Sequence, residues 1–150
     1  MFIGVTRSGG DVYQVTSDAA HTLNLGTDII SLDVAGETDA TQLLAGAANS
    51  NQTYFSIDSG ANWTTSTKEP TGDSETCVLM AHDFLSYGKA YATTSGTESA
   101  FSCTTDRNIT WNQISLIDTE ITNIKDLAPS PLYSQDNTLF MLTFGTKYSL

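Results

Sequence analysis

A segment of eleven residues occurs twice in this chain, and it restricts the possible fold more than any other feature of the sequence. The first copy, TYFSIDSGANW, ends at Trp63, and the second, FSCTTDRNITW, ends at Trp111. Their aspartates, Asp58 and Asp106, are 48 positions apart, and each stands five positions before its tryptophan. A fainter third copy, YQVTSDAAHTL, places Asp18 at the same point, 40 positions before Asp58. Such spacings are typical of a supersecondary unit that is repeated along the chain.

The sequence around these copies predicts short strands. Runs of five or six β-branched and aromatic residues alternate with Gly, Asn, Asp and Ser, which is the pattern of β-hairpins. Helical periodicity is nearly absent. We therefore expect an all-β protein with four strands in each full repeat. The expected strands are residues 29–34, 41–47, 53–57 and 63–67 in one repeat, and residues 76–81, 89–94, 100–105 and 110–116 in the next.

The flanking sequence repeats as well. Residues 84–94 align with residues 133–143, which pairs Phe84 with Tyr133. The segment ATQLLAGAA would suit a helix by propensity alone, but the repeat places its Leu43 at the position of Tyr91, so we expect a strand there. Aromatic residues at alternating strand positions are interpreted as core between sheets rather than as a stacking platform for sugars or bases. They are Tyr54, Phe55, Tyr91, Phe101 and Phe140.

The repeated segment suits a tight corner between a third and a fourth strand. An Asp there can accept hydrogen bonds from turn N–H groups that would otherwise lack a partner, and a Ser or Thr two positions earlier can add another. Gly60 supplies a positive φ, and Asn108, which replaces it in the second copy, is the next most suitable residue for left-handed geometry. Ala20 in the third copy is a poor substitute, so that turn is expected to be distorted or differently closed. The following Trp brings a large apolar side chain to a neighbouring sheet. The predicted structural residues are Thr16, Asp18, Ser56, Asp58, Gly60, Trp63, Thr104, Asp106, Asn108, Thr110 and Trp111.

These residues resemble the Asp-box, or BNR, repeat, whose pattern is Ser/Thr-x-Asp-x-Gly-x-Thr-Trp. The first copy departs from the pattern at Asn62 and the second at Asn108. The family includes sialidases, sortilin-type receptors, xyloglucan-degrading glycosidases and photosystem II assembly factors. The resemblance implies a β-propeller of four-stranded antiparallel blades around a central channel. It does not imply a particular function, because the same scaffold carries enzymes, receptors and assembly factors.

The repeats divide the chain, residues 1–150, into a single propeller segment. A partial blade is expected over residues 1–28, full blades over 29–70 and 74–118, and another partial blade over 120–150. This is a partial ring of about three to four blades, whereas propellers close with about four to eight. We therefore expect either a fragment of a longer protein or a subunit whose ring is completed by self-association.

The residues that sialidase chemistry requires are missing from the sequence. That family holds a substrate carboxylate with an arginine cluster, and this chain has only Arg7 and Arg107. Other glycosidases need two placed carboxylates, and Asp33, Asp83 and Asp126 are the ones that recur near the ends of first strands. Their regular spacing is interpreted as a turn role. We predict no catalytic residue and no cofactor, and expect a non-enzymatic scaffold or binding module, with part of a sialidase-like or other glycoside hydrolase propeller as the alternative.

The charge of the chain limits its partners. A formal net charge of −11 would repel nucleic acid and anionic lipid. In the resembling family the boxes lie opposite the usual ligand face, so the loops at the other end are the candidates for binding protein or glycan. Solvated loops of an acidic protein are the alternative reading of those residues. The candidate ligand-binding residues are Asp28, Glu69, Asp73, Glu75, Glu98, Asp118 and Glu120.

Metal binding and a disulfide are not expected. His21 and His82 have no Cys or His at ligand spacing, and no calcium-loop motif is present. Cys77 and Cys103 fall on the first and third strands of one blade, so a strand lies between them and we predict two free, buried thiols.

The sequence leads us to expect an extracellular or cell-surface protein without membrane insertion. No apolar run approaches the ~20 residues of a membrane helix, and the opening MFIGVTRSGG lacks the features of a signal peptide. Asn51, Asn62 and Asn108 begin sequons that would accept glycans only in a glycosylating secretory pathway.

Overall fold

The computed structural model describes residues 1–150 except for 8, 39, 97–98, 118–120, 146–147 and 150. Its regular structure is four antiparallel sheets and two helices of a single turn. The expected all-β class is therefore confirmed. In every sheet, strands that are consecutive in the chain are hydrogen-bonded neighbours, and none of the described sheets closes on itself.

The first and last sheets have three strands each, and the two middle sheets have four. The first contains β1 (Phe2–Gly4), β2 (Val12–Val15) and β3 (Ala20–Thr22). The second contains β4 (Ile29–Ala35), β5 (Gln42–Ala47), β6 (Thr53–Ser56) and β7 (Thr64–Thr65). The third contains β8 (Ser74–Met80), β9 (Ala90–Ser95), β10 (Ala100–Thr104) and β11 (Asn112–Leu116). The fourth contains β12 (Asn123–Pro129), β13 (Leu139–Phe144) and β14 (Tyr148–Ser149).

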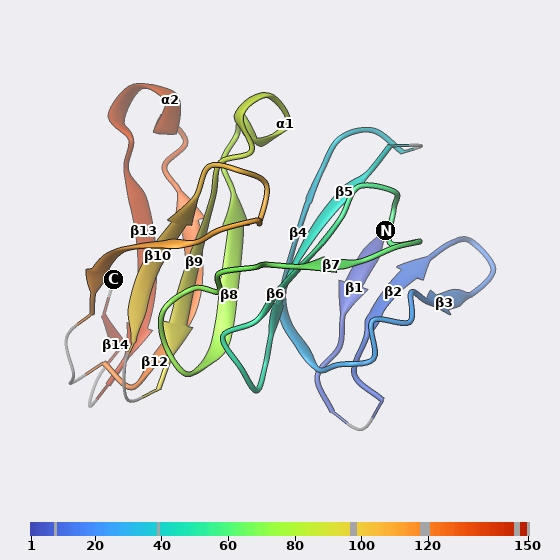
Figure 1. The fold of residues 1–150 in the computed structure, drawn as a ribbon, viewed down its shortest axis with the longest axis horizontal. Helices are drawn as coiled ribbons and strands as arrows, with labels where there is room; N and C mark the ends of the chain where they lie inside the picture. The colour runs from blue at the N-terminus through green and yellow to red at the C-terminus, as the bar shows by residue number, and fades with distance from the viewer. Residues whose placement is uncertain (8, 39, 97–98, 118–120, 146–147, 150) are drawn as a thin grey trace.

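The sheets stand side by side in chain order, from blue to red in Figure 1. Strand β4 contacts β8, and β8 contacts β12, so the first strands of successive sheets are neighbours. An apolar core fills each of the three spaces between adjacent sheets. Each sheet therefore has a leading face, which points to the preceding sheet, and a trailing face, which points to the next. Burial on both faces explains why β5 and β9 are almost wholly apolar or hydroxyl-bearing.

All eight expected strands of the two full repeats are present, with ends that differ by at most two residues. Residues 42–47 form β5 as expected, but the predicted equivalence of Leu43 with Tyr91 is wrong by one position. Leu44 lies in the core on the trailing face of its sheet, as Tyr91 does in the next sheet, whereas Leu43 points the other way. A shift of one residue moves a side chain to the opposite face of a strand.

Two short helices were not predicted. Helix α1 (Phe84–Tyr87) joins β8 to β9, and α2 (Tyr133–Asp136) joins β12 to β13. Both lie at the same end of the molecule in Figure 1. Each ends at a left-handed residue, Gly88 at φ 67° and Asn137 at φ 51°. Four residues are too few for helical periodicity to appear in a sequence, although the repeat correctly aligned Phe84 with Tyr133.

The aromatic residues follow the predicted core positions with one exception. Phe55 and Tyr91 are buried between sheets, Phe101 packs against the same core as Tyr91, and Tyr54 packs against the core between the first and second sheets. Phe140 is 44% exposed, which contradicts its expected place in a core. It lies on the trailing face of the last sheet, where no described residue covers it.

Candidate functional site

The first full box turn joins β6 to β7 and is held by Asp58. Its Oδ1 accepts the backbone N–H of Asn62 at 2.9 Å and its Oδ2 accepts the Asn62 side-chain amide at 2.8 Å. The Ser56 hydroxyl donates to the same carboxylate at 2.8 Å and accepts the N–H of Gly60 at 2.8 Å. The carboxylate and the hydroxyl therefore supply acceptors for N–H groups that no strand partner reaches.

The second full box turn, between β10 and β11, repeats this arrangement around Asp106. Its Oδ1 accepts the backbone N–H groups of Ile109 at 3.0 Å and Thr110 at 2.9 Å. The Thr110 hydroxyl donates to Oδ2 at 2.6 Å, and the Thr104 hydroxyl donates to Oδ1 at 2.7 Å. Asn62 in the first turn thus replaces both contacts of a threonine, which explains how that departure from the pattern is tolerated.

Left-handed backbone closes both turns. Gly60 has φ 89° and Asn108 has φ 71°, so Asn108 fills the glycine position as predicted. A Cβ added at Gly60 would stand 2.3 Å from Leu23 Cδ1. Asn108 is 2% exposed, and its Oδ1 accepts the Thr53 hydroxyl of the preceding sheet at 2.6 Å. Asparagine is less suited than glycine to left-handed backbone, but here its buried side-chain oxygen accepts a hydrogen bond from the preceding sheet.

The two tryptophans connect each turn to the preceding sheet. Trp111 is 1% exposed, and its indole N–H donates to the Thr53 hydroxyl at 3.0 Å and to Asn108 Oδ1 at 2.9 Å. Trp63 packs against the core between the first and second sheets. Its buried indole nitrogen has no hydrogen-bond partner among the described residues. Both side chains thus bring apolar area to a neighbouring sheet, as the sequence predicts.

The third, fainter copy forms a different turn. The Thr16 hydroxyl donates to the Ala19 carbonyl at 3.1 Å, and Asp18 accepts only from the Ser17 hydroxyl among the described residues. The expected distortion is therefore present. Sequence reasoning missed Asp11, which is 6% exposed and accepts the N–H groups of Val12 and Leu25 together with a hydroxyl. Asp11 lies outside the repeated segment, so no spacing marked it.

The hydrogen bonds of the box turns change the acidity of their carboxyl groups. The bonds from Asn62, and then that from Ser56, lower the pKa of Asp58 below its usual 3.8. At Asp106 burial acts to raise the pKa, but the bonds from Thr110, Thr104 and Ile109 outweigh it and lower the pKa. Both carboxylates are therefore charged acceptors at neutral pH and not proton donors.

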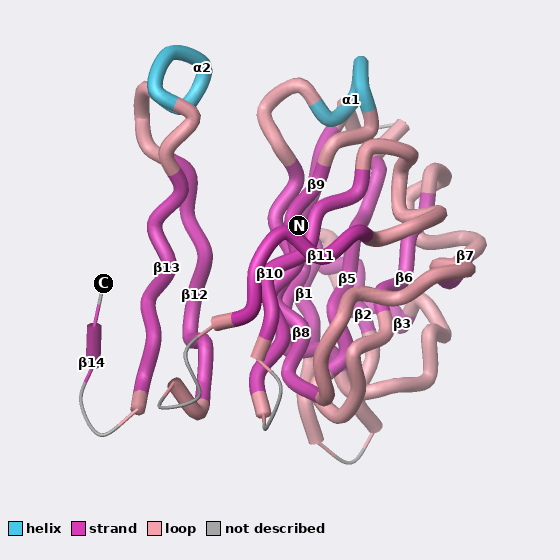
Figure 2. The backbone as a smooth tube through the Cα atoms, turned by 60° about the vertical axis from the view of Figure 1, so that its left-hand side comes forward, coloured by secondary structure: helices cyan, strands magenta, loops and turns pink. Residues whose placement is uncertain are grey.

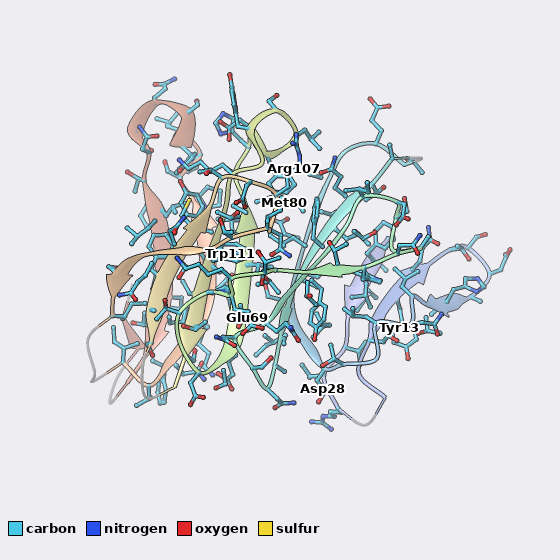
Figure 3. The ribbon with its side chains drawn as sticks, in the orientation of Figure 1. Tyr13, Asp28, Glu69, Met80, Arg107 and Trp111 are labelled. Atoms are coloured by element: carbon cyan, nitrogen blue, oxygen red, sulfur yellow. The ribbon has the colours of Figure 1, made fainter. Side chains whose placement is uncertain are left out.

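Those predicted ligand-binding residues that the structure describes lie at the other end of the molecule. Figure 3 shows Arg107, in a box turn, toward the end that carries α1, and Asp28 and Glu69 toward the opposite end. Glu98, Asp118 and Glu120 lie outside the described residues. Asp73 is exposed and lies against Gly96.

Three of the four described candidates gather around one loop, residues 48–52. Asn49 donates to Asp28 at 3.3 Å, and Gln52 donates to Glu69 at 3.2 Å. The backbone N–H of Glu75 donates to the carbonyl of Ala48 at 3.2 Å. We call Asp28, Glu69 and Glu75, with this loop, the acidic loop cluster. Its members are half-buried or exposed, and the sequence alone could not bring them together because the contacts join the second and third sheets and the connections beside them.

The recurring carboxylates that we interpreted as turn residues have other positions. Asp33 lies inside β4 and accepts the N–H of Met80, in the next sheet, at 2.6 Å. Asp126 lies inside β12 and accepts the N–H of Leu127. The turn role is therefore wrong for both, since they belong to strands. Asp83 precedes α1 and makes no side-chain capping bond.

The remaining candidates for chemistry are separate. Cys77 and Cys103 are free, on β8 and β10 with β9 between them, as predicted. Cys77 is buried, which raises its thiol pKa to about 11, but Cys103 is only half-buried, contrary to expectation. His82 contacts the edge of the Tyr133 ring. No three His, Cys, Asp or Glu side chains within the described part of the chain are placed to hold a metal ion.

Comparison with known proteins adds no relative. No protein-family model matches the chain, and neither a curated protein nor a solved structure is significantly similar to it. Among the described residues, no helix has the length and apolar character to cross a bilayer.

Proposed function

We propose that this chain is a non-enzymatic β-propeller scaffold of the Asp-box type, from an extracellular or cell-surface protein, that binds a partner at the acidic loop cluster. Each sheet would be one blade, with its first strand toward the axis. The neighbouring positions of β4, β8 and β12 support this arrangement.

The observation that carries the proposal is the use of the box carboxylates. The oxygens of Asp58 and Asp106 accept hydrogen bonds from their own turns. Their lowered pKa values place them in the ionised form, which cannot act as a general acid. The two box carboxylates therefore stabilise their turns, and we assign partner binding to the acidic loop cluster at the opposite end of the molecule.

The acidic loop cluster favours a partner with positive charge. Two of its carboxylates accept a hydrogen bond from a neutral side-chain amide, Asp28 from Asn49 and Glu69 from Gln52. These bonds orient the carboxylates but do not neutralise their negative charge. Such a surface attracts cations over about one Debye length, ~10 Å at 0.1 M salt. A basic protein segment fits this chemistry better than a neutral glycan.

The test is calorimetric titration with a short oligolysine peptide at two salt concentrations. We expect binding that weakens with salt and that falls about fivefold to tenfold, ~1–1.4 kcal/mol, in the Asp28→Asn/Glu69→Gln variant. The matched control is Asp18→Asn/Glu37→Gln, which removes the same charge from exposed residues away from the cluster.

Equal weakening in the two variants would attribute the binding to net charge and would overturn the assignment of the cluster. Binding of neutral cellotetraose instead of oligolysine would also overturn it and would favour a glycan site. Hydrolysis of aryl glycosides by the purified chain would contradict the non-enzymatic function.

A further inference from the structure

The trailing face of the last sheet has the residues of an interface but no described residue covers it. In the second and third sheets the middle position of this face holds Leu44, 0% exposed, and Tyr91, 5% exposed. The ladder pairs them with Asp33 and Leu79, respectively, on the first strands. Leu44 and Tyr91 are each buried against the next sheet.

The same register position in the last sheet is Phe140, which pairs with Ala128 on β12. Phe140 is 44% exposed, and Leu142, two residues further along the same face, is 36% exposed. In Figure 2, β12 and β13 lie at one side of the molecule, with only the short strand β14 beyond them. Phe140 is therefore the counterpart of two side chains that are buried, and Leu142 has the register position of Gly46 and Thr93, which are also buried.

A polar residue, Asp126, lies beside these two apolar side chains on the same face. Ser31 on β4 and Cys77 on β8 occupy equivalent ladder positions, and each bonds to the backbone of the next sheet. Ser31 accepts the N–H of Val78 at 3.0 Å, and the Cys77 thiol donates to the Ile124 carbonyl at 3.9 Å. Asp126 has this position in the last sheet, where it pairs with Leu142 and is exposed.

The leading face of the first sheet is the complementary surface. Ile3, 40% exposed, lies there beside Tyr13, Val15 and Ala20, which line a hollow of about 350 Å³. Arg7, in the β1–β2 hairpin of the same sheet, is exposed and matches the negative charge of Asp126. Leading faces of the other three sheets each pack on a trailing face.

We propose that the trailing face of the last sheet, formed by Phe140, Leu142 and Asp126, binds the leading face of the first sheet in a second copy of this chain. The two faces stand at opposite ends of the row of sheets (Figure 1), so the contact joins different surfaces and is heterologous. A heterologous contact closes a ring when the rotation permits it. Two copies contribute eight sheets, within the usual range of about four to eight blades, so we expect the ring to close after two copies. The closure of the ring rests on the propeller arrangement proposed above. The assignment of the two docking faces does not rest on it.

The test is the mass of the chain in solution by size-exclusion chromatography with light scattering. We expect twice the 16.1 kDa of one chain. The Phe140→Asp/Leu142→Asp variant is expected to be monomeric, as is the Ile3→Asp/Ala20→Asp variant. The matched control, Ile57→Asp/Ile109→Asp, changes apolar residues that are 66% and 55% exposed at the box turns, and is expected to stay dimeric.

A mixture of the two monomeric variants gives the sharpest result. Each retains one intact face, so a heterologous contact predicts a mixed dimer, with circular dichroism confirming that both variants are folded. A wild-type mass of one chain, a dimer that survives Phe140→Asp/Leu142→Asp, or folded variants that do not associate when mixed would each overturn the proposal. A mass above two chains would overturn the closure after two copies. Oligolysine binding does not depend on these faces, so the two proposals fail separately.

Discussion

Replacing Asp106 by Ala tests whether the box carboxylate holds its turn. The variant loses the acceptor for the N–H groups of Ile109 and Thr110 and for the hydroxyls of Thr104 and Thr110. A hydrogen bond to a charged group contributes ~1.5–3 kcal/mol. Because the turn is at the surface, water replaces part of this loss, and we expect the free energy of unfolding to fall by ~2–3 kcal/mol.

The assay is urea unfolding followed by tryptophan fluorescence, with Asp18→Ala as the control. Asp18 has the same place in the third copy, but among the described residues it accepts only from the Ser17 hydroxyl. Its replacement is expected to change the free energy of unfolding by less than ~0.5 kcal/mol. Similar losses in the two variants, or a loss below ~0.5 kcal/mol for Asp106→Ala, would refute the reasoning.

The same prediction has a pH dependence. The folded-state pKa of Asp106 is lowered from 3.8, so the carboxylate stabilises the folded chain above the unfolded pKa. This contribution is lost as the pH falls through the folded pKa. The difference between wild type and Asp106→Ala should therefore be full at about pH 7 and shrink below about pH 4. A difference that grows on acidification would contradict the assignment.

Two further substitutions and one labelling experiment test the same geometry. Gly60→Ala should cost at least ~2 kcal/mol of unfolding free energy in urea, because left-handed backbone costs ~1–2 kcal/mol and the new methyl meets Leu23. Trp111→Phe should cost ~2–4 kcal/mol by the same assay, since it deletes two buried indole bonds. In the native chain an aromatic disulfide reagent should modify Cys103 at least about tenfold faster than Cys77, whose thiol pKa is about 11; equal rates would contradict the burial.

Local features of this fold could be predicted from the sequence. The box turns form because their acceptors and left-handed residues act within a few positions of one another, so their spacing is visible in the chain. The strands likewise follow from their length and composition. This is why Ser56, Asp58 and Asn108 are in the predicted roles.

Features that depend on loops and on neighbouring sheets could not be predicted. Counting back from the box aspartates aligns Leu43 one position off, because the paired residues Tyr91 and Cys103 are 12 positions apart in the third sheet, whereas Leu44 and Phe55 are 11 apart in the second. Asp33 was assigned to a turn because its partner, Met80, lies 47 positions away in the next sheet. The members of the acidic loop cluster are predicted as binding candidates, but their position around one loop depends on the pairing of β4 with β5 and on the packing of β8 against β5.

The repeated turns of successive sheets depend on two equivalent carboxylates, Asp58 and Asp106, as fixed acceptors. Carbon-13 NMR titration of the side-chain carboxyl groups measures their pKa values directly in the folded chain. We predict that both are below 3.8, and that the amide proton signals of Asn62 and Thr110 move with the respective titrations. A pKa at or above 3.8 for either carboxyl group, or amide protons that do not follow it, would contradict the account.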